Sequence, residues 1–328
     1  MNYGLFVTPN PIQICINHDM FAVDLVIKQS LHSEVALINT IGNHIIDGGG
    51  KRLRPALMLL SSGLFAPINA QHHQLAAIVE FIHTATLLHD DVVDESALRR
   101  GKSTANHIFG NSASVLVGDF LYSRAFQMMV KLQNSRVMEV LSDATNVISE
   151  GEVLQLLNVH NADVTEQEYL KVIRYKTAKL FEAAARLGAV INHACNDDEN
   201  ALALYGMHLG TAFQLVDDVL DLSGDVNQIG KNLGDDLSEG KPTLPLLYAM
   251  QKSAPSDAVI IRNAMQAGGL TELASVLATV ESTSACEYVM KLAKVESDTA
   301  CDAIKHLPDS VYKQALMDLA NFAITRDH

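Results

Sequence analysis

Two short acidic segments carry the residues best suited to do chemistry. They read DDVVD and DDVLD and supply two sets of aspartates: Asp90, Asp91 and Asp94, and Asp217, Asp218 and Asp221. In a helix, residues four apart share a face, so Asp90 and Asp94 project together while Asp91 lies about 100° round the axis. One such segment is a weak signal, because a solvated acidic face can produce it. Two in apolar surroundings indicate a site, since carboxylates on a partly buried face repel one another and need a positive partner.

A divalent cation is the partner that these aspartates favour. Carboxylates without His or thiolate ligands select Mg²⁺ or Ca²⁺ over zinc. Mg²⁺ commonly keeps several waters and bridges a few carboxylates to substrate phosphates. We therefore expect the two sets to face each other and to hold metal ions for a phosphorylated substrate.

Basic residues bracket the first aspartate set. GGGKRLRP contributes Lys51, Arg52 and Arg54, and Arg99 and Arg100 follow the acids. The glycines let backbone approach a ligand, the following helix N-terminus attracts anions, and arginine can grip phosphate oxygens with two bonds. Any one of these cations could merely neutralise neighbouring acids. As a set they favour a diphosphate ligand.

Other kinds of site find no support in the sequence. The GKS at residues 101–103 has Ser96 where a Walker A motif needs its first glycine. HExxH and GxSxG are absent, which leaves zinc proteolysis and serine-esterase chemistry without a motif. The formal net charge of −14 opposes generic binding to nucleic acid.

The elements that must position these residues are predicted to be helices. Apolar residues recur at steps of three and four, as in residues 75–94, 112–130, 166–191 and 202–222. Strand alternation is scarce, which predicts an all-α fold. With 48% hydrophobic and 19% charged residues, the chain has ample apolar surface to bury and is not disordered. The length of 328 residues alone would allow roughly two domains.

Two glycine-rich breaks interrupt the helical pattern. At residues 48–50, a helix ending at Ile46 or Asp47 can be capped by glycines before Pro55 opens the next helix. Residues 223–245 are glycine-rich and charged, which predicts a mobile loop. After Lys252 the pattern is helical again but carries no cluster that we assign to chemistry.

Cysteine usage and the absence of apolar runs predict a cytoplasmic protein. The four cysteines are far apart and form no CxxC pair, so a reduced intracellular protein is the simplest reading. The first residues make a poor secretory signal. The sequence contains no run of about 18 apolar residues, so we predict no transmembrane helix.

Seven segments together resemble the trans-prenyltransferases, the polyprenyl diphosphate synthase family. They occur in the family's order: GGGKRLRP, LLHDDVVDESALRRGKSTAN, GDFLYSRAFQMM, EGEVLQL, YKTAKLFEAA, GTAFQLVDDVLD and GKNLGDDLSEGKPTLPLL. The resemblance is strongest to bacterial members that make octaprenyl diphosphate. It runs over residues 20–328, a single prenyltransferase domain, and leaves residues 1–19 as an N-terminal extension.

The resemblance implies a fold, ligands and residue roles. The fold is a single-domain helical bundle of the isoprenoid synthase type around a deep central cavity, usually in a homodimer. Two or three Mg²⁺ ions would be held by the six aspartates and bridged to the allylic diphosphate. Isopentenyl diphosphate would be held by Lys51, Arg54, His83 and Arg100. The allylic substrate would be held by Arg99, Lys176, Thr177, Gln214 and Lys231. Catalysis would be carried by four of the aspartates and three cations: Asp90, Asp91, Asp94, Asp217, Arg99, Lys176 and Lys231. Taken by itself, without the aspartates near it, His83 would be interpreted as a core histidine.

The implied reaction is Mg²⁺-dependent chain elongation. An allylic diphosphate, expected to be farnesyl diphosphate, loses its diphosphate and is extended by successive isopentenyl diphosphates. The expected product is a long all-trans polyprenyl diphosphate, octaprenyl for a quinone side chain. The segment with Lys231, Asp235 and Lys241 is a candidate lid that excludes water from the cation.

Product length is expected to depend on the residues beneath the first aspartate set. Ala85 and Thr86 are small, whereas short-chain members of the family often place aromatics there. A growing tail could pass them and stop at bulky residues such as Met128, Met129 and Leu141. Those methionines could equally be ordinary core residues.

Three other readings remain open. A class I terpene cyclase or head-to-head condensing enzyme can share the fold, but two full DDxxD motifs with GGGKRLRP favour a second diphosphate substrate. A non-catalytic subunit of a heteromeric prenyltransferase commonly loses the aspartates, and here both sets are intact. A di-iron helical bundle needs Glu-x-x-His pairs, which we do not find.

Overall fold

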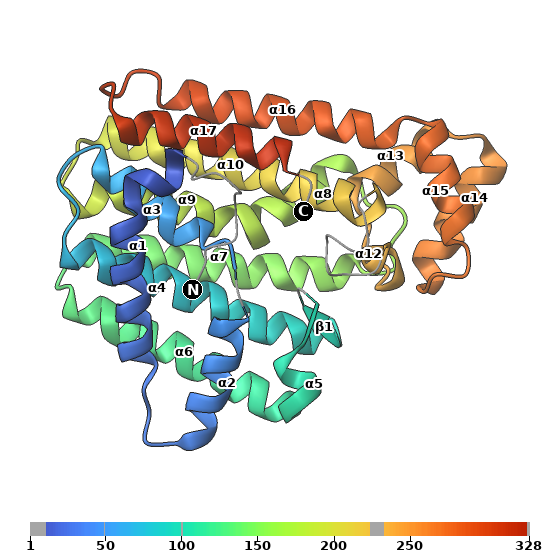
Figure 1. The fold of residues 1–328 in the computed structure, drawn as a ribbon. Coiled ribbons are helices and arrows are strands. Elements are labelled where there is room, and N and C mark those ends of the chain that lie inside the picture. Colours follow the sequence, from blue (N-terminus) through green and yellow to red (C-terminus); the bar gives the residue numbers. More distant parts are fainter. Residues whose placement is uncertain (1–10, 49, 100, 224–232, 327–328) are drawn as a thin grey trace. The chain divides into compact units, whose positions relative to one another are not determined.

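The computed structural model describes residues 11–48, 50–99, 101–223 and 233–326, and helices dominate them. The helices are α1 (Pro11–Leu31), α2 (Ala36–Asp47), α3 (Leu53–Gly63), α4 (Ala70–Val93), α5 (Ala105–Phe109), α6 (Asn111–Lys131), α7 (Ser135–Asn158), α8 (Glu166–Ile173), α9 (Lys179–Ile191), α10 (Asn196–Ser223), α12 (Asp235–Ser238), α13 (Leu244–Lys252), α14 (Pro255–Ala267), α15 (Leu273–Ser282), α16 (Ala285–Ala303) and α17 (Val311–Thr325) (Figure 1). The all-α prediction is confirmed. The end of α2 at Asp47 and the start of α3 just before Pro55 are also as predicted.

A short hairpin was not predicted. Strands β1 (Leu98–Arg99) and β2 (Lys102–Ser103) pair antiparallel, with Leu98 opposite Ser103. Gly101 between them has φ +72, a backbone conformation that glycine adopts without steric cost. Strands of two residues are too short to show alternation, so the pattern gave no warning. The hairpin fixes the backbone of Arg99, one of the predicted site residues.

The helix predicted over residues 166–191 is interrupted by a widened turn. A π-helix, η1 (Arg174–Ala178), lies between α8 and α9 and contains Lys176 and Thr177. Gly151 of α7 permits close packing there, because a Cβ at this position would lie 2.5 Å from the backbone N of Lys176. Single π-helical turns occur often at functional sites.

The described residues pack into two compact units. The first unit comprises residues 1–145, 180–206 and 303–319, and the second comprises residues 146–179, 207–302 and 320–328. Each unit draws on three stretches that alternate along the chain, so the units are not consecutive sequence domains. The central cavity implied by the resemblance stays a prediction.

Helix α4 is the main packing element of the first unit. It packs against α1, α3 and α6, and its course beside α6 is visible in Figure 1. Residues 75–79 of α4 are all fully buried, so the helix is enclosed on every side. Asn69 caps its N-terminus in a capping box with His72. This enclosed helix carries the first aspartate set at its C-terminal end.

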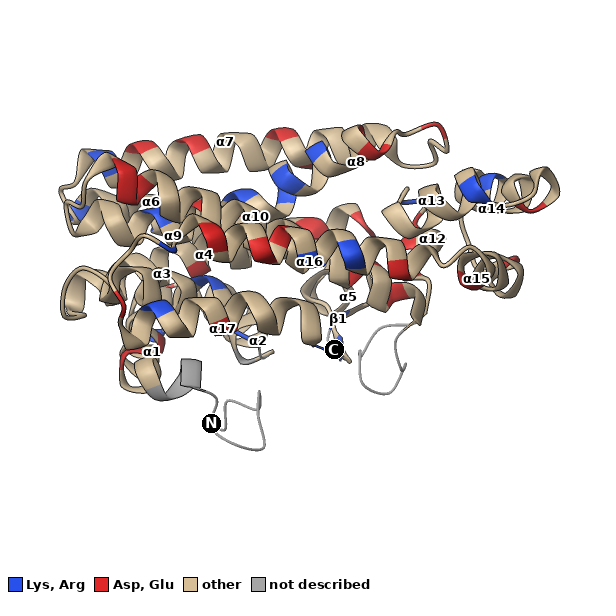
Figure 2. Ribbon diagram, turned by 90° about the horizontal axis from the view of Figure 1, so that it is seen from above, with Lys and Arg blue, Asp and Glu red and all other residues tan. Residues whose placement is uncertain are grey.

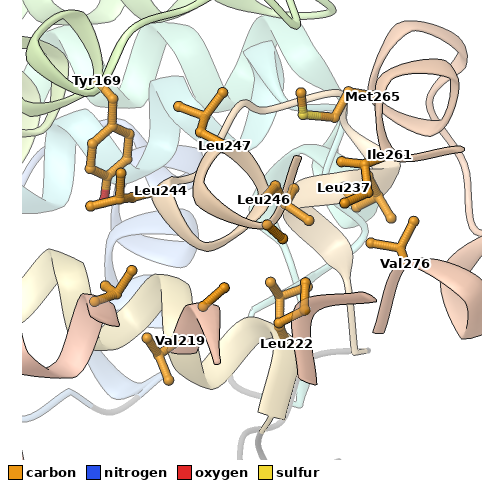
Figure 3. Close-up of a cluster of buried hydrophobic side chains, with 14 of the residues drawn as sticks. Tyr169, Val219, Leu222, Leu237, Leu244, Leu246, Leu247, Ile261, Met265 and Val276 are labelled. Atoms are coloured by element: carbon orange, nitrogen blue, oxygen red, sulfur yellow. The ribbon is translucent and has the colours of Figure 1, made fainter. Parts of the chain in front are cut away.

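The second unit has its own apolar core. Tyr169, Val219, Leu222, Leu237 and Leu244 belong to a cluster of buried residues in this unit, as Figure 3 shows. Helices α13, α14 and α15 pack against one another around part of it. Val219 and Leu222 lie beside the second aspartate set in sequence, so the core holds the end of α10 in place.

The loop predicted over residues 223–245 is partly helical. Residues 224–232 lie outside the described residues, whereas Asp235–Ser238 form α12 and Leu244 begins α13. Leu237 is fully buried in the core of the second unit, which explains why this part is folded. The prediction of an irregular segment is therefore wrong for residues 235–238.

The predicted N-terminal extension overlaps the first helix. Helix α1 begins at Pro11, and Ile16 and Met20 are both buried. The boundary drawn between residues 19 and 20 falls inside this helix, and as a domain boundary it stays a prediction. Among the described helices, none is long and apolar enough to cross a membrane.

Candidate active site

Both aspartate sets lie near the C-terminal end of a long helix. Asp90 is in the last turn of α4, and Asp94 caps that helix by donating from its backbone N to Asp90 O at 2.8 Å. Asp217 and Asp221 lie in the last two turns of α10. The C-terminal end of a helix carries a partial negative charge, so carboxylates there are electrostatically unfavourable. Carboxylates at these two helix ends therefore need a neighbouring cation more than carboxylates in the middle of a helix do.

In the first set, Asp91 is buried and paired with Arg99. Its side chain is 1% exposed and accepts from Arg99 Nε at 2.7 Å. Burial raises the pKa of Asp91, and the Arg99 guanidinium opposes that rise. The backbone O of Asp91 accepts from Ser96 N at 3.0 Å and from Asn106 Nδ2 at 2.9 Å. These hydrogen bonds hold the residues that follow α4 against Asp91.

In the second set, Asp217 is paired with Arg326, a residue that the sequence analysis missed. Arg326 Nη2 donates to Asp217 Oδ1 at 2.5 Å and to Phe213 O at 2.7 Å. The guanidinium also stacks over the Phe213 ring, 3.7 Å from its centroid. The Arg326 side chain is almost fully buried, whereas that of Asp217 is 40% exposed. No local signal could reveal this pair, because its members are 109 residues apart.

Asp218 is buried and held by neutral donors. It is 2% exposed; Tyr169 Oη donates to its Oδ2 at 2.5 Å and Gln214 Nε2 to its Oδ1 at 2.8 Å. Burial raises the pKa of Asp218 to about 8, and the nearby carboxylates of Asp236 and Asp217 add to the rise. Neither Tyr169 nor Asp236 was among the predicted site residues.

The YKTA turn is joined to this network. Thr177 Oγ1 donates to Gln214 Oε1 at 3.0 Å, so Thr177 and Gln214, both predicted substrate ligands, contact each other. Lys176 Nζ donates to Glu152 Oε2 at 2.6 Å. Glu152 comes from the EGEVLQL segment of α7, directly after Gly151. The second unit therefore brings three of the predicted motifs together.

The basic segment before α3 divides into two kinds of residue. Arg54 Nη1 donates to His83 Nε2 at 3.2 Å, which places the proton of a neutral ring on Nδ1. The guanidinium of Arg54 also lies over Phe181, 4.3 Å from the ring centroid. Arg52, by contrast, is largely buried and forms an ion pair with Glu80. Arg52 is thus committed to the interior of the first unit, whereas we had expected it to grip phosphate.

The remaining predicted ligand and lid residues have roles that the structure does not test. Arg100 and Lys231 lie outside the described residues. Lys51 is partly buried in the first unit, and Lys241 of the candidate lid forms an ion pair with Glu239 at 2.5 Å. Asp235 is the first residue of α12. The lid role and the ligand roles of these residues stay predictions.

The predicted length-determining residues are all in the first unit. Ala85 on α4 and Met129 on α6 are buried, and Met128 and Leu141 are buried as well. Thr86 is partly buried and donates from Oγ1 to His83 O at 2.8 Å. Core packing and length control are both compatible with these positions.

The donor chemistry of both sets fits Mg²⁺. Asp90, Asp94, Asp217 and Asp221 are partly exposed, and each pair is spaced four residues apart. Among the described residues, no three His, Cys, Asp or Glu side chains converge closely enough to form a metal site alone. Mg²⁺ typically takes one or two carboxylates and completes its shell with waters and substrate phosphates.

Charged residues elsewhere are intermingled. Figure 2 shows Lys and Arg positions dispersed among Asp and Glu positions, in keeping with 24 basic and 38 acidic residues. The basic residues of the site are therefore best judged one by one, from the side chains that each contacts.

Comparisons with known proteins agree on one family. The profile of the polyprenyl synthetase family matches residues 35–281. The octaprenyl diphosphate synthase of Escherichia coli (strain K12) is 51% identical over 310 residues, which cover 94% of this chain and 96% of that protein. The all-trans-nonaprenyl-diphosphate synthase (geranyl-diphosphate specific) of Rhodobacter capsulatus is 45% identical over 312 residues, 95% of this chain and 96% of its own.

A solved structure shows the same fold. The polyprenyl synthase of Caulobacter crescentus CB15, complexed with calcium and isoprenyl diphosphate, superposes with a TM-score of 0.94 at 41% identity. The match covers 98% of this chain and 98% of that one.

Proposed function

The chain belongs to the polyprenyl synthetase family and is a prenyltransferase, and we propose that it extends farnesyl diphosphate with isopentenyl diphosphates to all-trans octaprenyl diphosphate. The observation that carries this proposal is the 51% identity to an octaprenyl diphosphate synthase over 94% of the chain. Both aspartate sets and the basic segment GGGKRLRP are present within that length. The product would serve as the side chain of a quinone.

The four partly exposed aspartates are proposed to hold the metal ions. When bound, Mg²⁺ would neutralise the charge that develops on the leaving diphosphate and so favour its departure. Asp90, Asp94, Asp217 and Asp221 supply the carboxylates for this purpose. Asp91 and Asp218, which we also expected to be ligands, are buried against Arg99 and against Tyr169 with Gln214. Their proposed contribution is to fix the orientation of the flanking aspartates.

The basic residues are proposed to bind the two diphosphates. Arg54 and His83 are already in contact with each other, and Lys51 lies close by in sequence, which supports a shared role in holding isopentenyl diphosphate with Arg100. Lys176 and Thr177 are supported on the widened turn η1 and are proposed to bind the allylic diphosphate with Arg99, Gln214 and Lys231. A fixed guanidinium or ammonium costs little reorganisation when charge develops on the leaving group.

Product length is proposed to be set in the first unit. The small side chain of Ala85 lies one turn before Asp90, where a bulkier group would meet a growing hydrocarbon tail. Relatives at 51% and 45% identity carry the names of octaprenyl and nonaprenyl synthases, so overall identity distinguishes these products poorly. The proposal of eight units therefore rests on the more similar relative.

A homodimer in the cytoplasm completes the proposal. Helix α6 carries a row of exposed apolar side chains, Val115, Leu116, Phe126 and Val130, which a second copy could cover. The four cysteines are free, which suits a reducing compartment.

The test is a product analysis with purified protein. The protein is incubated with farnesyl diphosphate, isopentenyl diphosphate and Mg²⁺, and the products are sized by mass spectrometry. We expect octaprenyl diphosphate as the main product, with none when Mg²⁺ is chelated. A nonaprenyl or decaprenyl product would overturn the assigned length alone. No condensation with any allylic starter, from folded protein, would overturn the activity.

A further inference from the structure

Asp218 has both carboxylate oxygens committed inside the protein. Tyr169 Oη lies 2.5 Å from Oδ2, and Gln214 Nε2 lies 2.8 Å from Oδ1. The side chain is 2% exposed, so both bonds form away from bulk water. A buried carboxylate that lost one of these donors would leave an oxygen unsatisfied, which is costly.

The contacts of Asp218 extend to the turn that carries Lys176. Gln214 accepts from Thr177 Oγ1 at 3.0 Å while it donates to Asp218. Asp218 and Gln214 are one turn apart on α10, and Thr177 lies on η1. The three side chains and Tyr169 thus form one hydrogen-bonded network between α10, η1 and α8. Its geometry relates the second aspartate set to the YKTA turn.

Tyr169 is the most firmly held donor in this network. It lies near the start of α8, whose N-terminus is fixed by a capping box between Thr165 and Glu168. Its ring is buried in the core of the second unit, and Figure 3 shows it beside Leu244. A packed aromatic ring presents its hydroxyl in one place, which fixes the position of the donor to Asp218.

We propose that Tyr169 is a positioning residue for the second aspartate set. Its hydroxyl holds Asp218 in the interior, which keeps this carboxylate from the metal ions and fixes the turn of α10 that presents Asp217 and Asp221. Tyr169 touches neither substrate nor metal in this assignment. The inference takes one assumption from the proposed function, namely that Asp217 and Asp221 bind Mg²⁺ together with diphosphate.

The chain offers a matched control for removing this hydroxyl. Tyr205 is fully buried in the first unit, and its Oη donates to the backbone O of Leu316 at 2.6 Å. Tyr169→Phe and Tyr205→Phe each delete one buried hydroxyl that donates one hydrogen bond. Both variants should lose thermal stability to a similar extent, but only Tyr169→Phe removes a contact with the aspartates.

The experiment titrates Mg²⁺ in the presence of inorganic diphosphate and follows the rise in unfolding temperature. For Tyr169→Phe we expect the half-saturating Mg²⁺ concentration to rise by about tenfold, the lower end of the range for direct partners of metal ligands, because Tyr169 acts on the flanking aspartates through Asp218. Tyr205→Phe should titrate like the wild type. In the condensation assay, Tyr169→Phe should lower kcat and restore part of it at high Mg²⁺, with KM for isopentenyl diphosphate unchanged.

Two results would overturn the inference. One is a Tyr169→Phe titration that coincides with those of the wild type and Tyr205→Phe. The other is an equal shift in both variants, which would trace the effect to general destabilisation. If the wild type itself shows no Mg²⁺-dependent stabilisation with diphosphate, the proposed function is what has failed.

A second pair of variants keeps the test decisive if Tyr169→Phe does not fold. Asp218→Asn keeps the shape of the side chain, and its one amide oxygen can still accept from Tyr169. Its amide nitrogen then requires the Gln214 amide to turn over and accept. The half-saturating Mg²⁺ concentration should therefore change by no more than about threefold. Asp217→Asn removes a ligand and should abolish saturation. Equal losses in both variants would show that Asp218 binds the metal directly and would refute the positioning role.

Discussion

The two aspartate segments have the same residue at seven of eleven positions, yet each has its own means of compensating buried charge. Residues 84–94 read TATLLHDDVVD and residues 211–221 read TAFQLVDDVLD. In both, the second aspartate is buried and the flanking ones are partly exposed. Asp91 accepts from an arginine that follows it closely in the chain, whereas Asp218 accepts from Tyr169 and Gln214.

Two of the four substitutions between the segments supply partners that are particular to the second set. Where the first segment has Thr86, the second has Phe213, and this ring supports the guanidinium that pairs with Asp217. Where the first has Leu87, the second has Gln214, which donates to Asp218. A shared DDxxD spacing therefore determines where the carboxylates lie on a helix, but the neighbouring positions determine which partners reach them.

The largest expected effect tests whether the two sets contribute equally. Asp90→Ala and Asp217→Ala should each lower turnover by about 10³-fold or more, because each removes a carboxylate that is proposed to hold Mg²⁺ against the leaving diphosphate. Initial rates with radiolabelled isopentenyl diphosphate measure this, and circular dichroism should show little loss of helix. Near-normal activity in either variant would remove that set from the metal assignment.

A phenylalanine introduced five residues before each aspartate set distinguishes control of product length from an effect on core packing. Ala85→Phe should shorten the product, because the ring would obstruct a growing tail below Asp90. Ala212→Phe is the matched variant, since Ala212 is also fully buried and also precedes its first aspartate by five residues. It should destabilise the protein by about 1–3 kcal/mol through overpacking. Its product length should not change.

Sizing of radiolabelled products by chromatography decides between these outcomes. A full-length product from Ala85→Phe would return Ala85 to an ordinary core role. Equal shortening by both variants would mean that product length depends on general packing and not on the first unit.

Arg326→Gln should affect the second set alone. The substitution removes the charged partner of Asp217 and the stacking on Phe213, so the metal-free protein should lose about 1–3 kcal/mol of unfolding free energy. Mg²⁺ with inorganic diphosphate should restore part of this loss, because the metal supplies the missing positive charge. Urea unfolding with and without Mg²⁺ and diphosphate is the measurement. A loss that is unaffected by the metal would indicate that Arg326 only packs α17 against α10.

The last expected effect concerns pH, and it acts on the metal-free protein alone. The pKa of Asp218 is raised from 3.8 to about 8, so the folded metal-free protein binds a proton that the unfolded chain releases within this interval. Stability should therefore fall as pH rises from 3.8 towards about 8. Asp218→Asn should flatten this slope when unfolding temperature is followed across that pH range in EDTA. An unchanged slope would show that Asp218 is already ionised in the folded protein.

Much of the fold could be predicted because the signals are local. Spacing of three and four residues marked the helices, and Pro55 and the glycines before it marked a helix boundary. The shared face of Asp90 and Asp94 follows from helical geometry alone, and the backbone bond between them confirms it. The hairpin at Leu98 escaped notice because two-residue strands have no period to detect.

The partners of the aspartates could not be predicted because they come from distant parts of the chain. Tyr169 reaches Asp218 across 49 residues, and Arg326 reaches Asp217 across 109. Arg52 looked like the other cations of its segment, but the fold places Glu80 against it. In each case several residues of the same type look alike in the sequence, and the tertiary packing determines which of them makes the contact.

Gly151 has a consequence for anyone who engineers product range in this protein. Even a methyl group there would press on the backbone of Lys176, so an alanine on one helix would displace a lysine on another that is proposed to bind diphosphate. If saturation mutagenesis of residue 151 yields active protein with glycine alone, this position restricts which variants of the enzyme can be made.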